Sequence, residues 1–522
     1  MHCGANNFRS FLLRVAVLGF VALAPCANAT VYYVDQAIGN DSNVGTTELL
    51  PWKNSPGMDS YSGRGNLVAG DTVYFNSSRT WVVTGTQGLY LAGGVAYIGN
   101  SWGTGTRATL RAGADLPAAV VRFKDDASVP TVIRGFDIDA NGKVANGIEM
   151  NHSFYAGPLT GAVKRVDNVI VHHVWSRTSL GQYKYGIIVS NSGGASAEVA
   201  NVEIINSVIH DISRDGLPIY PGDQNANCIV RNVVVRGNTV YNTGQDPDYG
   251  AGSGIIVKGR VIGATIENNY VTATKGAGIF INGNESHHYG FGPLNISIRN
   301  NIVNVNTIHG SIRIYDGASG SDPKQVDIYG NIVYGNILGS GLLLGSDLGN
   351  SNSIRVVGNT FYNAPVVISS NSANFPVFDF KNNIVYQSSG IPLIDSGRII
   401  SHSNNIYYGS GSLVRSGGTS YTASNLGVYE PTGLSSDPLF VNMTEVPTGF
   451  IGTSVNATVP NTTGLALKPA SNAIDRGAML ASPFDKSING VSRPSGTGWD
   501  IGAYESQGNN SIQSPANLRV VR

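Results

Sequence analysis

A short motif recurs through the middle of the chain and constrains the fold more than any other feature. A glycine, or in one copy a serine, is followed by an apolar residue, a variable residue and a second apolar residue. Each copy is typical of a three- or four-residue strand, and the uneven spacing suits one coil per copy with loops of varying length. The copies begin at Gly147, Gly186, Gly216, Gly254, Gly278, Ser311 and Gly341.

A series of asparagines recurs between these copies with a similar spacing. They recur in contexts such as Glu267-Asn268-Asn269 and Arg299-Asn300-Asn301. Two strand patterns and one turn asparagine per repeat predict parallel coils stacked on one another. Identical side chains at a coil spacing of about 4.8 Å can form a ladder of amide hydrogen bonds. The series comprises Asn206, Asn238, Asn269, Asn301, Asn331, Asn359, Asn383 and Asn405.

The composition fits a globular chain that is rich in turns. Of 522 residues, 13% are charged and 66 are glycine, whereas an average globular chain is about 25% charged and about 7% glycine. A hydrophobic fraction of 41% is enough to bury a core, so disorder is excluded. Lys+Arg and Asp+Glu are equal at 34 each, which argues against a nucleic-acid-binding protein. No helix of three amphipathic turns is expected.

Residues 1–29 have the features of a signal peptide. Arg9 and Arg14 precede an apolar run at residues 15–24, and Ala27-Asn28-Ala29 forms a cleavage site. The run is too short to span a membrane, so we expect cleavage near Ala29 and export to the periplasm or the medium, with no membrane span left. Cys228 is then the one remaining cysteine. It lies among β-branched residues, which predicts a buried, inert thiol rather than a disulfide or a nucleophile.

Residues 130–410 resemble the right-handed parallel β-helix of the pectate-lyase-like superfamily. The opening around Tyr32 and Trp52 and the closing stretches around Asp437 and Trp499 are similar to the ends of secreted members. The resemblance implies an all-β fold, a single-stranded right-handed parallel β-helix with capping segments at both ends, whose acidic residues are structural. We divide the chain into a signal peptide (1–29), an N-terminal cap with the first coils (30–130), the repeats (131–410), C-terminal coils with a closing segment (411–505) and a tail or linker (506–522).

A β-helix of this kind has no internal cavity, so function is expected on its outer faces. Side chains alternate in direction along a strand, and residues at one position on successive coils lie about 5 Å apart. The motif therefore predicts a row formed by Tyr220, Lys258, Asn282 and Tyr315. Phe280 and Arg313 belong to the neighbouring outward column, and Arg260 joins the row if its strand continues past Lys258.

These groups suit cleavage of an acidic polysaccharide by β-elimination. The reaction removes the C5 proton of a uronate once its carboxylate is neutralised, and then expels the oxygen at C4. Lysine or tyrosine can act as the base, whereas arginine can bind the carboxylate through two nitrogens. We expect Lys258 to be the base and Tyr220 the acid or second base. Relatives of the alginate and pectate lyase type use a lysine or arginine base, which implies the same role for Lys258.

The remaining site predictions concern substrate and metal. Arg260 and Arg313 would neutralise the carboxylate, and His309 would protonate the leaving group. Asn282, Phe280 and Tyr315 would bind sugar rings of an acidic polysaccharide. The protein is expected to be a monomer. No cofactor is certain, although Asp223, Asp246 and Asp248 form a candidate calcium site. The adjacent pairs His172-His173 and His287-His288 should point to opposite faces of a strand, which argues against metal binding.

Three other functions stay open. A glycoside hydrolase needs two carboxyl groups roughly 5 to 10 Å apart, which Asp215, Asp223, Asp246 or Asp248 could supply. A uronan epimerase shares the proton-abstraction step, but its Asp-Pro-His sequence is approached only by Asp246-Pro247-Asp248. A non-enzymatic carbohydrate-binding β-helix would use Tyr220, Phe280 and Tyr315 for stacking on sugars.

Overall fold

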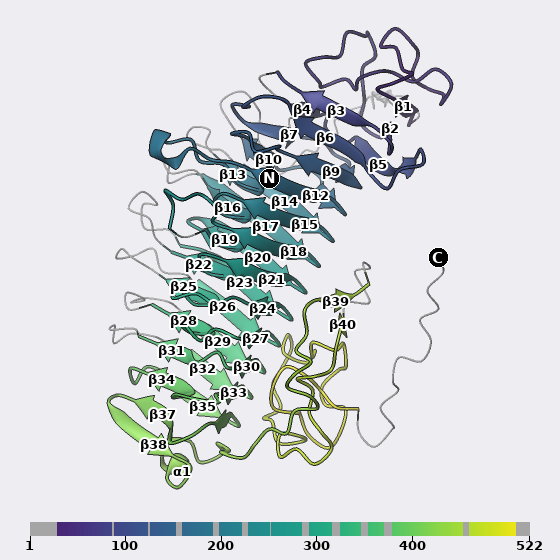
Figure 1. Ribbon diagram of the computed structural model, residues 1–522. Helices are drawn as coiled ribbons and strands as arrows, with labels where there is room; N and C mark the ends of the chain where they lie inside the picture. The colour runs from purple at the N-terminus through teal and green to yellow at the C-terminus, as the bar shows by residue number, and fades with distance from the viewer. Residues whose placement is uncertain are drawn as a thin grey trace, which may run out of the picture.

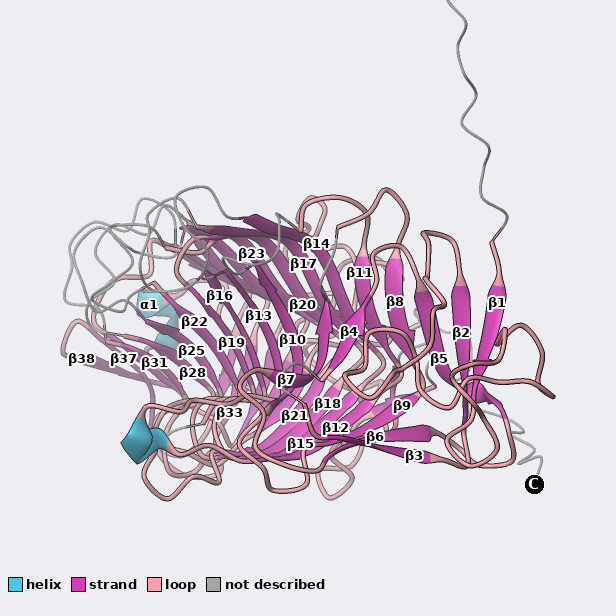
Figure 2. Ribbon diagram, turned by 90° about the horizontal axis from the view of Figure 1, so that it is seen from above, coloured by secondary structure: helices cyan, strands magenta, loops and turns pink. Residues whose placement is uncertain are grey.

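The computed structural model describes most of the chain after the expected signal peptide. Three long sheets account for most of its strands, and their strands follow one another along the molecule (Figures 1 and 2). We name them sheets A, B and C. The described residues are 29–85, 88–123, 126–152, 159–191, 198–221, 228–250, 252–283, 292–315, 324–345, 353–369, 378–452 and 459–507.

Each coil contributes one strand to sheet A, then one to sheet C and one to sheet B. The strands of sheet A are β1 (Val31–Val34), β2 (Thr72–Asn76), β5 (Ala96–Trp102), β8 (Thr131–Arg134), β11 (Lys164–Asp167), β14 (Glu198–Ile205), β17 (Ile229–Arg236), β20 (Val261–Glu267), β23 (Leu294–Arg299), β26 (Lys324–Tyr329), β29 (Ile354–Val357), β32 (Phe378–Lys381) and β35 (Ser401–Ser403). Those of sheet C are β3 (Thr80–Val83), β6 (Ala108–Ala112), β9 (Phe136–Asp139), β12 (Ile170–Val174), β15 (Val208–Ile212), β18 (Thr239–Thr243), β21 (Tyr270–Thr274), β24 (Ile302–Asn304), β27 (Ile332–Tyr334), β30 (Thr360–Tyr362), β33 (Ile384–Tyr386) and β36 (Ile406–Tyr408).

Sheet B carries the repeated glycine motif. Its strands are β4 (Leu89–Leu91), β7 (Ala119–Phe123), β10 (Asn146–His152), β13 (Ile187–Asn191), β16 (Leu217–Pro221), β19 (Ile255–Lys258), β22 (Ile279–Asn282), β25 (Ile312–Tyr315), β28 (Leu342–Leu344), β31 (Val366–Ile368), β34 (Leu393–Asp395), β37 (Ser412–Ser416) and β38 (Thr419–Thr422). The other elements are a 3-10 turn, η1 (Thr178–Leu180), the helix α1 (Leu426–Tyr429), and the hairpin of β39 (Phe450–Ile451) and β40 (Val459–Pro460). Within the described ranges, α1 is the one α-helix.

The stacked parallel sheets confirm the predicted right-handed parallel β-helix. Apart from β37 and β38, successive strands within each sheet pair in parallel, as β16 pairs β19 through Leu217 and Ile255. Alternate residues point inward, so Ile255 and Val257 have no exposed surface. Branched side chains suit these strands because they pack well against neighbours on a pleated surface. The motif's glycine is needed because an added Cβ at Gly254 would lie 2.7 Å from the carbonyl oxygen of Gly278 on the next coil.

The asparagine ladder is confirmed from Asn238 onward. Each side-chain amide donates to the Oδ1 of the next asparagine at 2.9–3.1 Å, through to Asn405, whose amide donates to the buried carboxylate of Glu430. Asn206 is not part of the ladder, because Ser207 occupies that position and donates its backbone N–H to Asn238. Asn206 instead has a φ of 51° and occupies the left-handed position that precedes the ladder.

Segments at both ends cover the terminal coils. At the start, Trp52 is 1% exposed and stacks on Tyr32 at 4.5 Å between ring centroids. At the other end, β37 and β38 form an antiparallel hairpin, and Glu430 closes the ladder.

The rest of the C-terminal region lies along the side of the β-helix, which the sequence did not predict. Apolar residues of this closing segment, such as Phe440 and Ile501, pack on Ile302, Ile332 and Ile384 of sheet C. In Figure 1 the segment runs beside β27 to β33. Its acidic residues make structural contacts, as expected: Glu505, for example, accepts the backbone N–H groups of Ser495 and Asp500 at 2.9 Å.

Cys228 is 3% exposed, and burial raises the pKa of its thiol, in agreement with an inert side chain. Among the described residues, no helix has the length and apolar character that a membrane span requires. The predicted signal peptide and the tail lie almost entirely outside the described residues.

Candidate functional site

The outward row predicted on sheet B is present in the register of the strands. Ser190 pairs with Tyr220, Lys258 with Asn282, and Asn282 with Tyr315. In the neighbouring column, Phe280 pairs with Arg313. The sheet therefore brings the predicted row and the Phe280–Arg313 pair onto one outer face, which we call the sheet B strip.

Lys258 and Tyr220 are in direct contact at the centre of this strip. The Lys258 ammonium lies 4.6 Å from the centre of the Tyr220 ring, a cation–π distance, and both side chains are partly exposed. Tyr220 also forms a side-chain hydrogen bond with Tyr185. Burial holds the pKa of Tyr185 well above its usual value, so Tyr185 keeps its proton and can donate to the Tyr220 oxygen.

Arg214 extends the strip with residues that sequence reasoning missed. Its guanidinium lies 3.7 Å from the ring centre of Tyr249, 4.2 Å from that of Tyr183 and 5.7 Å from that of Tyr185. Burial opposes the charge of Arg214, but the hydrogen bond to Tyr249 and the charges around it, including Asp215, raise its pKa. All these residues lie in the turns that lead from sheet C to sheet B. Those turns have no periodic pattern, so the sequence did not indicate that these residues would lie beside the strip.

Arg313 forms a second aromatic and cationic cluster two coils beyond Lys258. Its guanidinium lies 4.6 Å from the ring centre of Tyr315 and 5.0 Å from that of Phe280. His309 lies close enough for the charge of Arg313 to affect it, and burial together with that charge lowers the pKa of His309. A histidine with a lowered pKa is neutral near pH 7, which does not favour the predicted role as the proton donor.

Arg260 was expected to join the row only if its strand continued past Lys258, and the strand does not continue. Strand β19 ends at Lys258, and Gly259 adopts a left-handed φ of 68°. Sheet A resumes at Val261, so Arg260 lies in a two-residue turn instead of on the outer face of sheet B.

The candidate calcium site is only partly within the described residues, because Asp223 lies outside them. Asp246 is 3% exposed, and its carboxylate accepts hydrogen bonds from the Thr178 hydroxyl and from the backbone N–H of Asp248 at 2.9 Å. Asp248 itself is exposed. Where side chains are described, Asp246 and Asp248 do not gather with a third metal-binding side chain.

The expectation that His172 and His173 point to opposite faces is wrong. His173 has a left-handed φ of 55°, which breaks the alternation of β12 and turns both rings to one side. Their ring centroids lie 4.4 Å apart. Asp211, Asn242 and Ala273 repeat the left-handed conformation on the next three coils, with φ from 49° to 55°. Positive φ at a residue other than glycine is uncommon, so the regular alternation of side chains along a strand did not predict this bulge. The His287-His288 pair lies outside the described residues.

The fold and this outer face define a right-handed parallel β-helix protein with an aromatic and cationic strip. A family model described as disaggregatase related matches residues 199–322, about a quarter of the chain. No curated protein matches the chain.

Solved structures similar to this chain include several carbohydrate-active enzymes. Pectate lyase Pel9A is 17% identical, with 91% of this chain and 96% of that chain covered and a TM-score of 0.47. The GH136 lacto-N-biosidase from Eubacterium ramulus is 13% identical, with 74% and 65% covered and a TM-score of 0.42. The A-module of the Azotobacter vinelandii mannuronan C-5 epimerase AlgE6 is 14% identical, with 70% and 91% covered and a TM-score of 0.35. At these values none of them assigns an activity to this chain.

Proposed function

We propose that this protein is a secreted polysaccharide lyase that cleaves a uronate-containing polymer by β-elimination at the sheet B strip. The observation that carries the proposal is the alternation of cations and aromatic rings along successive coils, from Arg214 through Tyr220 and Lys258 to Arg313. Coils repeat about every 4.8 Å, which is close to the length of one sugar unit. A polyanion lying along the strip would therefore place carboxylates near Arg214, Lys258 and Arg313, with the coil of Asn282 and Phe280 between the last two.

Lys258 and Tyr220 supply the acid–base pair of the proposed reaction. Lys258, as the free amine, takes the C5 proton of the uronate. The C5–H electron pair forms the double bond between C4 and C5, and the bond from C4 to its oxygen breaks. Tyr220 gives its proton to that oxygen, and the hydrogen bond from Tyr185 supports the phenolate that results. In the reverse assignment, Tyr220 is the base.

Arginine side chains bind the substrate carboxylate in this scheme. Neutralising it makes the C5 proton more acidic, since negative charge develops toward the carboxylate as the proton leaves. Arg313 is held by Phe280 and Tyr315 with its guanidinium against two rings, and Arg214 is held likewise at the other end of the strip. Arg260, in the turn directly after Lys258, is a further candidate for this role. Asn282, Phe280 and Tyr315 would contact the neighbouring sugars.

The carboxylates near the strip have structural partners, which favours the lyase over a hydrolase. Asp215 is 6% exposed and accepts the backbone N–H of Ser253 at 2.7 Å. Asp246 is bonded to Thr178 and to the Asp248 backbone. A hydrolase needs one carboxyl group to protonate the leaving oxygen and another to attack or activate water.

Ultraviolet absorbance during incubation with polymers tests the proposal. Alginate, polymannuronate, pectate, chondroitin and hyaluronan would each be offered to the mature protein with and without Ca²⁺. A lyase creates an unsaturated end, so absorbance should rise on one acidic polymer. New reducing ends without absorbance would identify a hydrolase. A change in sugar composition without cleavage would identify an epimerase, and polymer binding without any product would identify a binding protein. Each of these three outcomes would overturn the proposal.

A further inference from the structure

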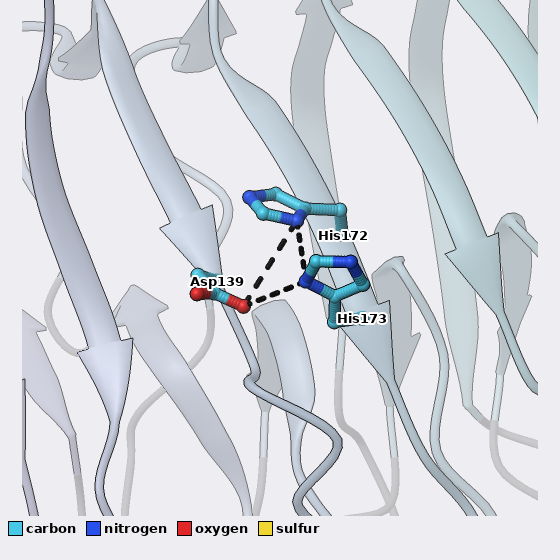
Figure 3. Close-up of side chains that lie close together, drawn as sticks. All are labelled: Asp139, His172 and His173. Atoms are coloured by element: carbon cyan, nitrogen blue, oxygen red, sulfur yellow. Dashed lines mark hydrogen bonds and ion pairs between the residues drawn. The ribbon is translucent and has the colours of Figure 1, made fainter.

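Two histidines and an aspartate meet on sheet C, on a different sheet from the strip. Asp139 ends β9, and His172 and His173 belong to β12 on the next coil. Figure 3 shows the two imidazoles and the carboxylate turned toward one another. The two Nδ1 atoms are 2.9 Å apart, and Asp139 Oδ1 lies 3.1 Å from Nδ1 of His173 and 3.9 Å from Nδ1 of His172.

These three distances fit a single metal ion. The circle through the three atoms has a radius of about 2.0 Å, which matches the usual Zn–N and Zn–O bond lengths of about 2.0–2.2 Å. One ion placed close to their plane lies within bonding distance of all three atoms, and side-chain rotations that shorten the His172–Asp139 separation would bring the ligand angles toward the tetrahedral arrangement of zinc. Two imidazole nitrogens and one carboxylate oxygen suit a divalent transition metal, whereas calcium prefers oxygen ligands alone.

The surrounding residues hold the ligands in the form that a metal requires. His172 Nε2 lies 2.6 Å from Asp137 Oδ1. A carboxylate at that nitrogen keeps the proton on Nε2 and leaves the lone pair of Nδ1 available, as in many metal-binding histidines. Asp139 is fixed by Arg111 at 2.8 Å and by the Asn141 backbone N–H at 2.8 Å.

The site is also open on one side. Asp139 is buried and the His172 side chain is 14% exposed, but the His173 side chain is 53% exposed. An ion held by three protein atoms here would keep a position for water or another ligand.

We propose that Asp139, His172 and His173 bind one divalent transition-metal ion of the zinc class. This inference is independent of the lyase proposal. The bound ion links two successive coils through β9 and β12, so its binding stabilises this part of the β-helix. In the competing explanation, the two imidazoles share a proton and the cluster is only a hydrogen-bond network.

Calorimetric titration of Zn²⁺ into the untagged, chelator-treated mature protein tests the site. We expect one ion per chain, a higher thermal midpoint with Zn²⁺, and no comparable binding of Ca²⁺. His173→Ala should lose the binding while staying folded, because its side chain is largely exposed. Asp137→Asn should weaken the affinity about 10- to 100-fold, the usual cost of losing a carboxylate behind a histidine ligand. His309→Ala is the matched control and should bind as the wild type does, because His309 lies in the turn between β24 and β25, several coils beyond the cluster.

Cobalt provides a second readout that does not depend on stability. Co²⁺ in the same site should give visible absorption bands that His173→Ala abolishes. Absence of Zn²⁺ binding in the wild type would overturn the proposal in favour of the hydrogen-bond network. Equal binding by wild type and His173→Ala would overturn it by placing the ion elsewhere.

Discussion

Arg313 illustrates how single residues define the sheet B strip. Its guanidinium lies against Phe280 and Tyr315, and burial lowers its pKa, although it remains charged at any physiological pH. A cation that is already partly desolvated and oriented loses little further freedom when it binds a carboxylate. The position of Arg313 in the outward column was predicted from the motif, whereas Arg214 was not, since it lies in a turn.

Replacement of Arg313 should weaken catalysis on the acidic polymer. Arg313→Ala removes a charged hydrogen-bonding partner, so kcat/KM should fall roughly 10- to 100-fold. Arg313→Lys should recover only part of the loss, because lysine lacks the two-nitrogen fork. The control is Arg415→Ala, an exposed arginine farther along the same column. Steady-state kinetics with unchanged values for Arg313→Ala would contradict the proposed role.

Asp35 should stabilise the N-terminal cap in a pH-dependent way. Burial disfavours its charge, but the N–H groups of Ala37 and Ile38 and the Arg79 side chain outweigh that effect and lower its pKa below 3.8. A lowered pKa contributes stability that is present above the unfolded-state pKa and is lost as the pH falls through the folded-state value. Asp35→Asn should therefore cost about 1–3 kcal/mol near pH 7 and progressively less below about pH 4.

Urea unfolding from pH 7 to pH 3 checks this difference. Glu48→Gln, at an exposed site in the same region, provides the control and should show a small effect at all pH values. A stability gap for Asp35→Asn that stayed constant down to pH 3 would mean that the carboxylate charge is not responsible.

At the scale of elements, the turn between sheets A and C uses two adjacent residues for different tasks. The first residue is left-handed and is glycine or asparagine, as in Gly237, Asn268 and Asn300. The second points inward and forms the ladder, as in Asn269 and Asn301. The regular spacing of the asparagines predicted the ladder. Because some coils have Gly-Asn and others Asn-Asn at this turn, the sequence did not show which residue of each pair forms the ladder. This explains why Asn206 was mistaken for a ladder residue.

Substitutions at Asn300 and Asn301 should separate these tasks. Asn301→Ala leaves the buried N–H of Asn269 without its acceptor and should cost about 3 kcal/mol or more. Asn300→Gly should be nearly neutral, because glycine adopts a φ of 53° without strain and other coils have glycine there. Thermal unfolding of the two variants measures the difference. Equal destabilisation would contradict the assignment.

For the whole molecule, the sequence predicted the stack of coils well because strand alternation and repeat spacing are local signals. It also predicted which residues face outward on sheet B. It did not predict the path of the closing segment, because docking on the side of sheet C depends on contacts between residues far apart in the chain. Ile302 and Ile501, which share one cluster, are about 200 residues apart. The bulge at His173 was missed for a different reason, since it depends on a left-handed local conformation that a histidine does not predict.

A charge placed under the closing segment should release it from the β-helix. Ile501 is 1% exposed, so Ile501→Asp buries an unpaired carboxylate. The carboxylate can reach water only if the closing segment detaches from sheet C. Limited proteolysis should then cut within residues 434–507 while residues 30–430 resist. Met479→Asp, 72% exposed in the same segment, should leave the digestion pattern unchanged. Protection of the segment in Ile501→Asp would show that its docking does not depend on this cluster.

In the proposed reaction, Lys258 removes a proton from a uronate on the sheet B strip. The most direct test compares the initial rate of ultraviolet absorbance increase for the wild type, Lys258→Ala and Lys468→Ala on the polymer that the wild type cleaves. Lys468 is an exposed lysine of the closing segment and serves as the control. We predict a loss of at least about 100-fold for Lys258→Ala, as expected when a catalytic base is removed, and no change for Lys468→Ala. Full activity in a folded Lys258→Ala protein would contradict the role of Lys258 as the base.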